Sequence, residues 1–390
     1  MNYKKILAYC YLLFSGIPTA LASSLLASAM QQMKKQYPDK SIGQVKQINS
    51  IPSLLLSIAA PFLMLFMNKL TEKFKLVLIP SLILYSIIGT IPILFYQSYT
   101  SVIVCRIFLG LFCGITEPFS LKLISKKSVS LFGFRATTMS FVALIFSLTG
   151  GLIVDTAGWQ YLFLFYSFGV VLALLVGIGD FNSGSYIEIQ QKQSNVQSGQ
   201  PDTVEQITVK LQNIEQKSQI KQFIPVYLTS FISQLSYYIL PQSISMKLKQ
   251  IGVTDALRCG VASGLSMFFN GLASLFLKQI QRFLKSKRNV SIFCLLTTGL
   301  SMCGFAFSNN YGLVLFTVSI SGLFMGNQLA NINSWVSSIK STPLTLGLNS
   351  FCTFFSHFLT SYLFCFKDEQ WNIMTAGLVQ FVWGIILVLL

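Results

Sequence analysis

Residues 102–114 read Val102-Ile-Val-Cys-Arg106-Ile-Phe-Leu-Gly110-Leu-Phe-Cys-Gly114, and this stretch decides the fold class. It is apolar apart from Arg106, and it makes up most of an apolar run from 101 to 121. A run of about 20 apolar residues spans the ~30 Å hydrocarbon core of a bilayer as an α-helix. Gly110 and Gly114 form a small-residue face on which a second helix can pack closely. The stretch therefore predicts a membrane-spanning helix with one buried charge.

The composition of the whole chain agrees with a membrane protein. Of its 390 residues, 53% are hydrophobic and 10% charged, and the mean hydropathy is +0.63. A soluble domain carries about 25% charged residues, so a soluble enzyme, a nucleic-acid-binding module and a disordered scaffold are all disfavoured. The eight cysteines form no C-x-x-C pair and there is a single histidine, so we expect neither a metal site nor a cofactor.

Apolar runs of spanning length occur twelve times along the chain. They lie at about 6–30, 47–67, 76–96, 101–121, 134–154, 159–179, 222–246, 259–279, 289–307, 311–335, 345–366 and 371–390. The first run is too long for the apolar part of a signal peptide and is expected to remain as a helix. A polar stretch rich in Gln, Ser and Asn separates the sixth run from the seventh. We therefore expect an all-α membrane protein with a six-helix bundle at 1–180, a cytoplasmic linker at 181–221 and a second six-helix bundle at 222–390.

The charges of the connecting segments predict the orientation. With the N-terminus inside, the inside segments sum to +13 and the outside segments to +3. Lys and Arg are enriched in the cytoplasmic loops of membrane proteins. The imbalance places both termini in the cytoplasm of a multi-pass protein of the cell membrane, and it explains the net charge of +16 without any nucleic-acid partner.

An internal repeat appears when the chain is shifted by 212 residues. Gly110-Leu-Phe-Cys-Gly114 then falls on Gly322-Leu-Phe-Met-Gly326, the basic loop 69–75 falls on 281–287, and Trp159 falls on Trp371. Because each half holds an even number of helices, the repeats are parallel and related by a pseudo-two-fold axis along the membrane normal. In transporters built from such repeats, the substrate site lies between the halves, near the membrane midplane.

The sequence resembles the major facilitator superfamily of secondary transporters, and in particular bacterial efflux-type members. The stretch 102–114 is similar to the family's helix-4 motif, an Arg followed by Gly four and eight residues later, and Arg135 is similar to the Arg that enters helix 5. Asn68-Lys-Leu-Thr-Glu72-Lys73-Phe resembles the family's G-x-L-x-D-R loop, with Glu72 for Asp and Lys73 for Arg. The helix-5 Gly-Pro pair associated with antiporters is missing near 146–147.

Arg106 and Glu117 are interpreted as the ionisable residues that lie well inside a spanning helix. Charged groups at membrane depth are costly and mark pathways, relays or pairs. The two are about three turns apart on one helix face, roughly 16 Å along the axis, so each needs a partner elsewhere. Glu117, Arg106 and His357 are therefore candidates for proton coupling, with packing roles as the alternative for each.

Polar stripes at helical spacing provide candidates for the wall of a substrate cavity. Helices 1, 4, 7 and 10 line the cavity in the resembled family, and the stripes fall on three of them. The candidates are Tyr11, Ser15, Thr19, Gln234, Tyr238, Gln242, Asn327, Gln328 and Asn331. The alternative is hydrogen bonding between helices, worth about 0.6 kcal/mol on average in membranes.

A cluster of charges at the cytoplasmic face is expected to act as a gating loop. Glu72, Lys73 and Lys75 are expected to lie beside Arg135, and charge pairs between these helix ends would hold the outward-open state.

We expect a monomeric transporter that works by alternating access and exports a small amphipathic organic compound in exchange for protons. The alternative is a facilitator or importer of a small polar solute. A membrane enzyme would need clustered catalytic groups at one face, and the sequence contains no Walker loop for ATP.

Overall fold

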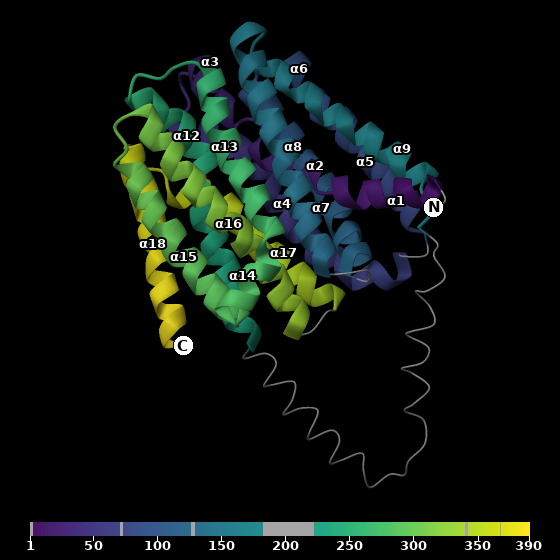
Figure 1. The fold of residues 1–390 in the computed structure, drawn as a ribbon. Coiled ribbons are helices and arrows are strands. Elements are labelled where there is room, and N and C mark those ends of the chain that lie inside the picture. Colours follow the sequence, from purple (N-terminus) through teal and green to yellow (C-terminus); the bar gives the residue numbers. More distant parts are fainter. Residues whose placement is uncertain (1–2, 71–72, 126–128, 182–221, 340–341, 367) are drawn as a thin grey trace, which may run out of the picture.

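The computed structural model describes residues 3–70, 73–125, 129–181, 222–339, 342–366 and 368–390, and these are helical almost throughout (Figure 1). In the first half the helices are α1 Tyr3–Phe14, α2 Ile17–Ser24, η1 Ala27–Ala29, α3 Met30–Gln36, α4 Ile42–Leu70, α5 Phe74–Thr90, α6 Pro92–Phe95, α7 Tyr99–Ser125, α8 Val129–Thr156, η2 Trp159–Ser167 and α9 Phe168–Ile178. In the second half a helical stretch over 222–237 precedes α12 Ile239–Gln250, α13 Ala256–Leu275, α14 Leu277–Leu284, α15 Lys287–Ala306, α16 Tyr311–Ile339, α17 Pro343–Leu363 and α18 Glu369–Leu389.

Ten helices of the described residues are long and apolar enough to cross a membrane, and one bent pair raises the number to eleven. The more polar α17, with 21 residues, is long enough to be the twelfth. The expected all-α membrane fold is therefore confirmed, and the count is consistent with twelve spans. The linker predicted at 181–221 lies outside the described residues, apart from its first residue.

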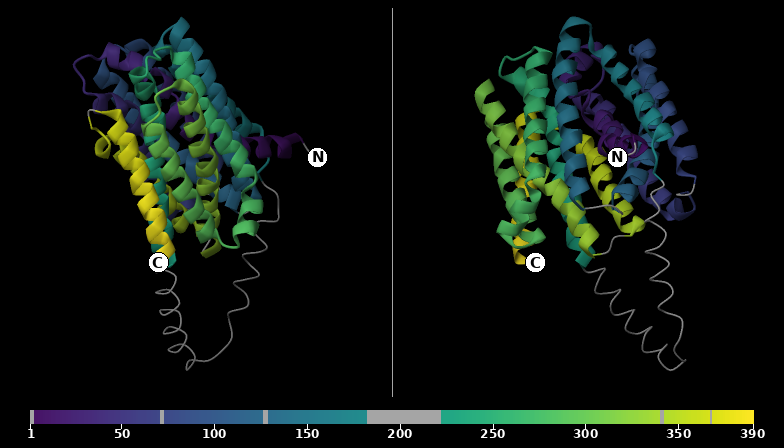
Figure 2. Two further views of the ribbon diagram at one scale, coloured as in Figure 1. Left: turned by 60° about the vertical axis from the view of Figure 1, so that its left-hand side comes forward. Right: turned by 45° about the vertical axis from the view of Figure 1, so that its right-hand side comes forward.

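Several spans are broken where the sequence predicted continuous helices. The first is divided at Gly16 and again at 25–26, so that α1 turns across the direction of the neighbouring helices (Figures 1 and 2). The eighth was expected over 259–279, but α13 ends at Leu275 and α14 leaves at 62° to it. Hydropathy does not reveal these breaks, because apolar residues continue through them.

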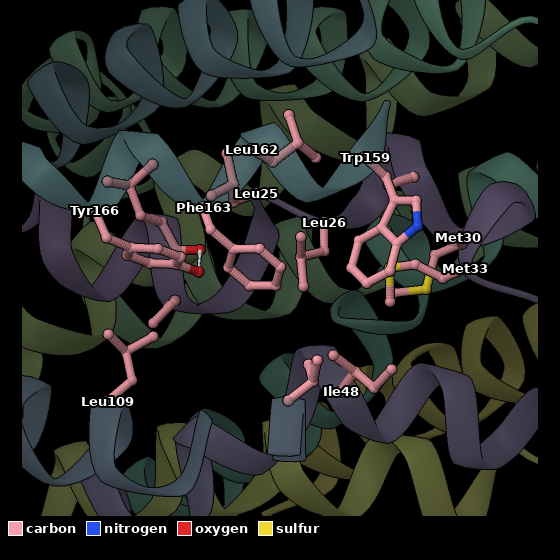
Figure 3. Packing of buried hydrophobic residues seen from close by; sticks show 14 of the residues in the cluster. Leu25, Leu26, Met30, Met33, Ile48, Leu109, Trp159, Leu162, Phe163 and Tyr166 are labelled. Carbon is pink, nitrogen blue, oxygen red and sulfur yellow. Dashed lines mark hydrogen bonds between the residues drawn. The ribbon is translucent and has the colours of Figure 1, made fainter. Parts of the chain in front are cut away.

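The core of the first half is built from aromatic rings on η2. Trp159, Phe163 and Tyr166 are all buried and belong to one cluster with Leu26 and Met33. Figure 3 shows these rings pointing from η2 toward the broken first helix. Three residues per turn bring Phe163 and Tyr166, which are three residues apart, onto one line of the helix.

The repeated glycines make the same contact in each half. A Cβ on Gly110 would lie 2.2 Å from the carbonyl oxygen of Pro52, so α7 packs directly on the backbone of α4. A Cβ on Gly322 would lie 2.1 Å from the carbonyl oxygen of Ser266, and one on Gly326 would lie 2.0 Å from that of Asn270, so α16 packs in the same way on α13. The repeat seen in the sequence is thus a repeat of helix packing.

Two helix pairs join the halves. α8 packs against α13, where Gly260 faces the backbone of Ser147 and Thr137 donates to the carbonyl oxygen of Gly271 at 3.1 Å. α4 packs against α17, where Gly347 faces Pro61. We call the end at which α9 and α18 finish the linker end, and the end at which α4, α13 and α18 start the far end (Figure 1).

Candidate functional site

A cavity lies between the two halves. It is lined by residues of α2, α7, the helical stretch 222–237, α12 and α16, and by the inner faces of α8, α13 and α17, which also join the halves. It encloses about 1110 Å³ of empty space, part of it open to solvent. It reaches toward the linker end, because Leu121 and Asn333 line it from the last turns of α7 and α16. Its polar lining comprises Thr19, Ser23, Ser24, Glu117, Arg135, Ser140, Gln234, Tyr237, Tyr238, Asn270, Asn333, Asn349, Ser350, Thr353 and His357.

A buried ion pair forms the charged part of the wall. Arg135 of α8 donates to Glu117 Oε2 of α7 at 2.5 Å, and Thr19 of α2 donates to the same oxygen at 3.1 Å. The Nε of Arg135 donates to Ser15 Oγ at 3.2 Å. Glu117 is therefore paired with a basic residue of another helix, as expected for a carboxylate at membrane depth. Because the two charges cancel, this wall offers hydrogen bonds and a titratable group without a net charge.

The opposite wall is neutral and incompletely bonded. His357 Nε2 lies 3.3 Å from Gln234 Oε1, and Asn349 donates to Asn333 Oδ1 at 2.8 Å. Three further polar atoms are buried without a hydrogen-bond partner among the described residues: Gln234 Nε2, His357 Nδ1 and Asn349 Oδ1. Leaving such atoms unpaired costs about 1–3 kcal/mol each, so this wall is suited to a ligand that both donates and accepts.

Arg106 lies outside the cavity. Its guanidinium donates to the Ile48 carbonyl oxygen at 2.8 Å, and to the Tyr166 hydroxyl and the Ala22 carbonyl oxygen. These contacts join the first, second, fourth and sixth spans. The structure thus places this proton-coupling candidate in a structural position and the other two, Glu117 and His357, on the cavity wall.

The predicted cavity candidates divide into two groups. Thr19, Gln234 and Tyr238 line the cavity, whereas Ser15 contacts it through Arg135. Tyr11 and Gln242 do not line the cavity. The Tyr11 hydroxyl lies 3.2 Å from Ser120 Oγ, and the Gln242 side chain accepts a hydrogen bond from Ser361.

The three amides expected to line the cavity from the tenth span face the other way. Asn331 donates to the Lys287 carbonyl oxygen at 2.6 Å and to Ser291 at 2.9 Å, while Asn327 and Gln328 are buried away from the cavity. Met325, Leu329 and Asn333 line it instead. Asn331 bonds within its own bundle, and the side-chain amide of Gln328 is buried without a hydrogen-bond partner among the described residues, so the density of amides did not mark the face that lines the cavity.

The gating cluster is not assembled as expected. Lys75 donates to the carbonyl oxygens of Gly177 and Gly179 at 3.1 and 2.8 Å, so it joins two spans of the same half. Lys73 is exposed, and Arg135 belongs to the cavity pair. Glu72 lies outside the described residues.

The far end is closed by polar contacts that the sequence did not indicate. Lys46 of α4 and Glu369 of α18 lie 2.8 Å apart with exposed fractions of 1% and 2%, and Ser243 donates to Glu369 at 2.7 Å. Asp155 accepts from the backbone N–H groups of Ala256 and Leu257 at 2.9 and 2.8 Å. Both contacts cross between the halves. In the sequence, each acid lies at the edge of an apolar run, where nothing indicates a partner in the other half.

Two helical bundles, closed at one end and separated by a polar cavity toward the other, have the architecture of membrane transporters built from parallel repeats. The family model described as Major Facilitator Superfamily matches residues 12–361, so the chain belongs to this superfamily.

Two solved structures are similar to the whole chain. One is described as a partially occluded inward open conformation of the xylose transporter XylE from E. coli, with a TM-score of 0.72, 11% identity and coverage of 98% of this chain and 97% of that one. The other is described as a D-xylose-proton symporter, with a TM-score of 0.70, 13% identity and coverage of 98% and 96%. At these identities the likeness shows the fold. No curated protein sequence matches the chain significantly.

Proposed function

We propose that this transporter couples proton movement to the export of a small, uncharged organic compound with one polar and one apolar face. The observation that carries the proposal is the Glu117–Arg135 pair in the cavity wall. Protonation of Glu117 removes its charge and with it most of its attraction for Arg135. A ligand that donates a hydrogen bond to Glu117 needs the charged carboxylate, and a proton on that carboxylate removes the acceptor. A proton and a ligand therefore compete for Glu117.

The rest of the lining supports an amphipathic ligand. Met139, Met267, Met325, Leu329 and Phe354 provide apolar surface beside the amides and the imidazole. Methionine side chains adapt to ligands of different shape. The cancelled charge of the ion pair disfavours a ligand with a net charge, because such a ligand would have to be desolvated without a counter-charge. We place the linker end in the cytoplasm, so the cavity would load from inside the cell.

A second candidate is uptake of a small polar solute together with protons. The unpaired polar atoms of Gln234, His357 and Asn349 favour it, because they suit a ligand rich in hydroxyl groups. The two similar structures are described as a xylose transporter and a xylose-proton symporter, which agrees with this alternative.

Transport by the purified protein in liposomes separates these candidates whatever the direction of insertion. In liposomes with an acidic lumen, exchange for protons accumulates the compound; with an acidic exterior, co-transport accumulates it. One pH unit supplies about 1.4 kcal/mol, enough for about tenfold accumulation at one proton per solute. We expect an amphipathic compound to accumulate with the acidic lumen. Accumulation of a polar solute with the acidic exterior favours the second candidate, and equilibration without accumulation contradicts proton coupling.

A further inference from the structure

The short helix α14 extends beyond the length needed to cross the membrane. α13 has 20 residues, about 30 Å at 1.5 Å per residue, and so spans the hydrocarbon core by itself. α14 follows at 62° to α13, at the linker end of the second half (Figure 1). Because α13 already has the length of a span, we place α14 along the membrane surface and not across it.

The two faces of α14 differ in chemistry. Gln281 donates to Asn331 Oδ1 of α16 at 2.8 Å, which fixes one side of the helix against the bundle. The residues that point away from the bundle are of two kinds: Phe276 and Phe283 are 49% and 83% exposed, and Lys278 and Arg282 are exposed beside them. Large exposed rings next to basic side chains are typical of helices that lie in the interface of a bilayer.

The basic side chains have no acidic partner nearby in the sequence. Between Asp255 and Asp368 the chain contains neither Asp nor Glu, although it contains Lys278, Arg282 and Lys285. None of the four ion pairs found in the described part of the chain involves these three residues. Their charge is therefore left for a partner outside the described structure.

We infer that α14, with Phe276 and Lys285 at its two flanks, is a binding surface for anionic phospholipids of the adjoining leaflet. The rings of Phe276 and Phe283 enter the boundary of the acyl chains, and Lys278, Arg282 and Lys285 bind the phosphates of the head groups. Each basic residue near an anionic membrane surface contributes about fivefold in affinity. Loss of two is therefore expected to weaken the preference for anionic over neutral lipid by about tenfold or more.

The test compares two variants of the full chain that lose the same charge. Lys278→Gln/Arg282→Gln removes two basic groups from α14, and Lys35→Gln/Lys249→Gln removes two exposed basic groups near the far end. Each protein is placed in nanodiscs of phosphatidylcholine and phosphatidylglycerol, and the lipids that it retains on extraction are counted by native mass spectrometry. We expect the first variant to lose the preference for phosphatidylglycerol and the second to keep it. Equal retention by all three proteins, or equal loss in both variants, would overturn the inference.

Amide hydrogen exchange gives a readout that does not depend on the variants. Exchange over 276–286 of the unmodified protein should be slower in nanodiscs with phosphatidylglycerol than in phosphatidylcholine alone, and the difference should shrink at high salt because head-group attraction is screened. The same exchange in both lipids would show that α14 does not bind the anionic head group. A difference that persists at high salt would contradict binding by charge.

Discussion

Lys46 and Glu369 are 323 residues apart in the sequence, yet they form a buried ion pair 2.8 Å long that holds the two halves together at the far end. Ser243 of α12 donates to the same carboxylate. Such a pair contributes little more to the free energy of unfolding than apolar residues of the same size. Removal of one partner, however, leaves a buried charge at a cost of about 3–5 kcal/mol. The pair therefore stabilises a state in which the far end is closed, and water can replace both partners when that end opens.

Lys46→Gln should shift the protein toward opening at the far end. Cys259, which is buried and lies 3.7 Å from the side chain of Gln31 near this end, is a native reporter. We expect its rate of modification by a maleimide to rise several-fold, as measured by mass spectrometry of the purified protein. Lys40→Gln removes a lysine from a half-exposed pair with Asp39 and should have no effect. If Cys259 reacts equally in all three proteins, the ion pair does not hold the far end closed.

Glu117→Gln should abolish transport driven by a pH difference while ligand binding is retained. Glutamine keeps the size of the side chain and can accept from Thr19 and Arg135, but it cannot exchange a proton. The measurements are accumulation in liposomes and, separately, exchange of labelled for unlabelled ligand without a gradient, which should continue. Asp39→Asn, in an exposed segment, is the control. Accumulation by the Gln variant equal to that of the unmodified protein would assign proton coupling to another group, with His357 next to be tested.

Arg106→Lys should lower stability more than it alters coupling. The planar guanidinium bonds acceptors on three other spans, and a single ammonium cannot reach them all. Hydrogen bonds to a charged group contribute about 1.5–3 kcal/mol each, so a loss of about 3 kcal/mol and a lower unfolding temperature are expected. Arg258→Lys, which changes an exposed pair with Asp255, should alter neither the unfolding temperature nor proton coupling. If the variant unfolds at an unaltered temperature but no longer couples transport to protons, Arg106 takes part in proton coupling.

Gly110→Ala should disrupt the first bundle. The added Cβ would lie 2.2 Å from the Pro52 carbonyl oxygen, and backbone cannot move aside as a flexible side chain can. Gly304→Ala is the control, because its Cβ would lie 3.4 Å from Thr317, an ordinary contact. We expect the first variant to give little folded protein, and the second to match the unmodified chain in yield and unfolding temperature. Similar behaviour of the two variants would contradict the close packing of α7 on α4.

The sequence predicted the spans and the packing of the repeated glycines because both depend on local patterns. Apolar length determines what can cross a membrane, and a glycine pair four residues apart marks a helix face wherever it occurs. Asn349, Thr353 and His357 follow one another at intervals of four residues, which places them on one helix face, and all three line the cavity. Asn270, an isolated amide within an apolar run, also lines the cavity.

The partners of the buried charges could not be predicted, because they depend on how helices are rotated against one another. Arg135 was assigned to a loop cluster since it follows a basic segment, but the orientation of α8 turns it toward Glu117. Lys46 lies just before the apolar run predicted at 47–67, but α4 begins at Ile42 and includes it. On α16, Asn331 bonds to α15, and the cavity is lined by Met325, Leu329 and Asn333.

The matching glycine contacts also bear on how the chain is made. Gly110 closes on Pro52, and Gly322 on Ser266, so each contact joins two spans of the same half that follow one another closely in synthesis. The first bundle can therefore complete its packing in the translocation machinery while the ribosome is still producing the second. Lys46 can pair with Glu369 only after the ribosome has added a further 323 residues.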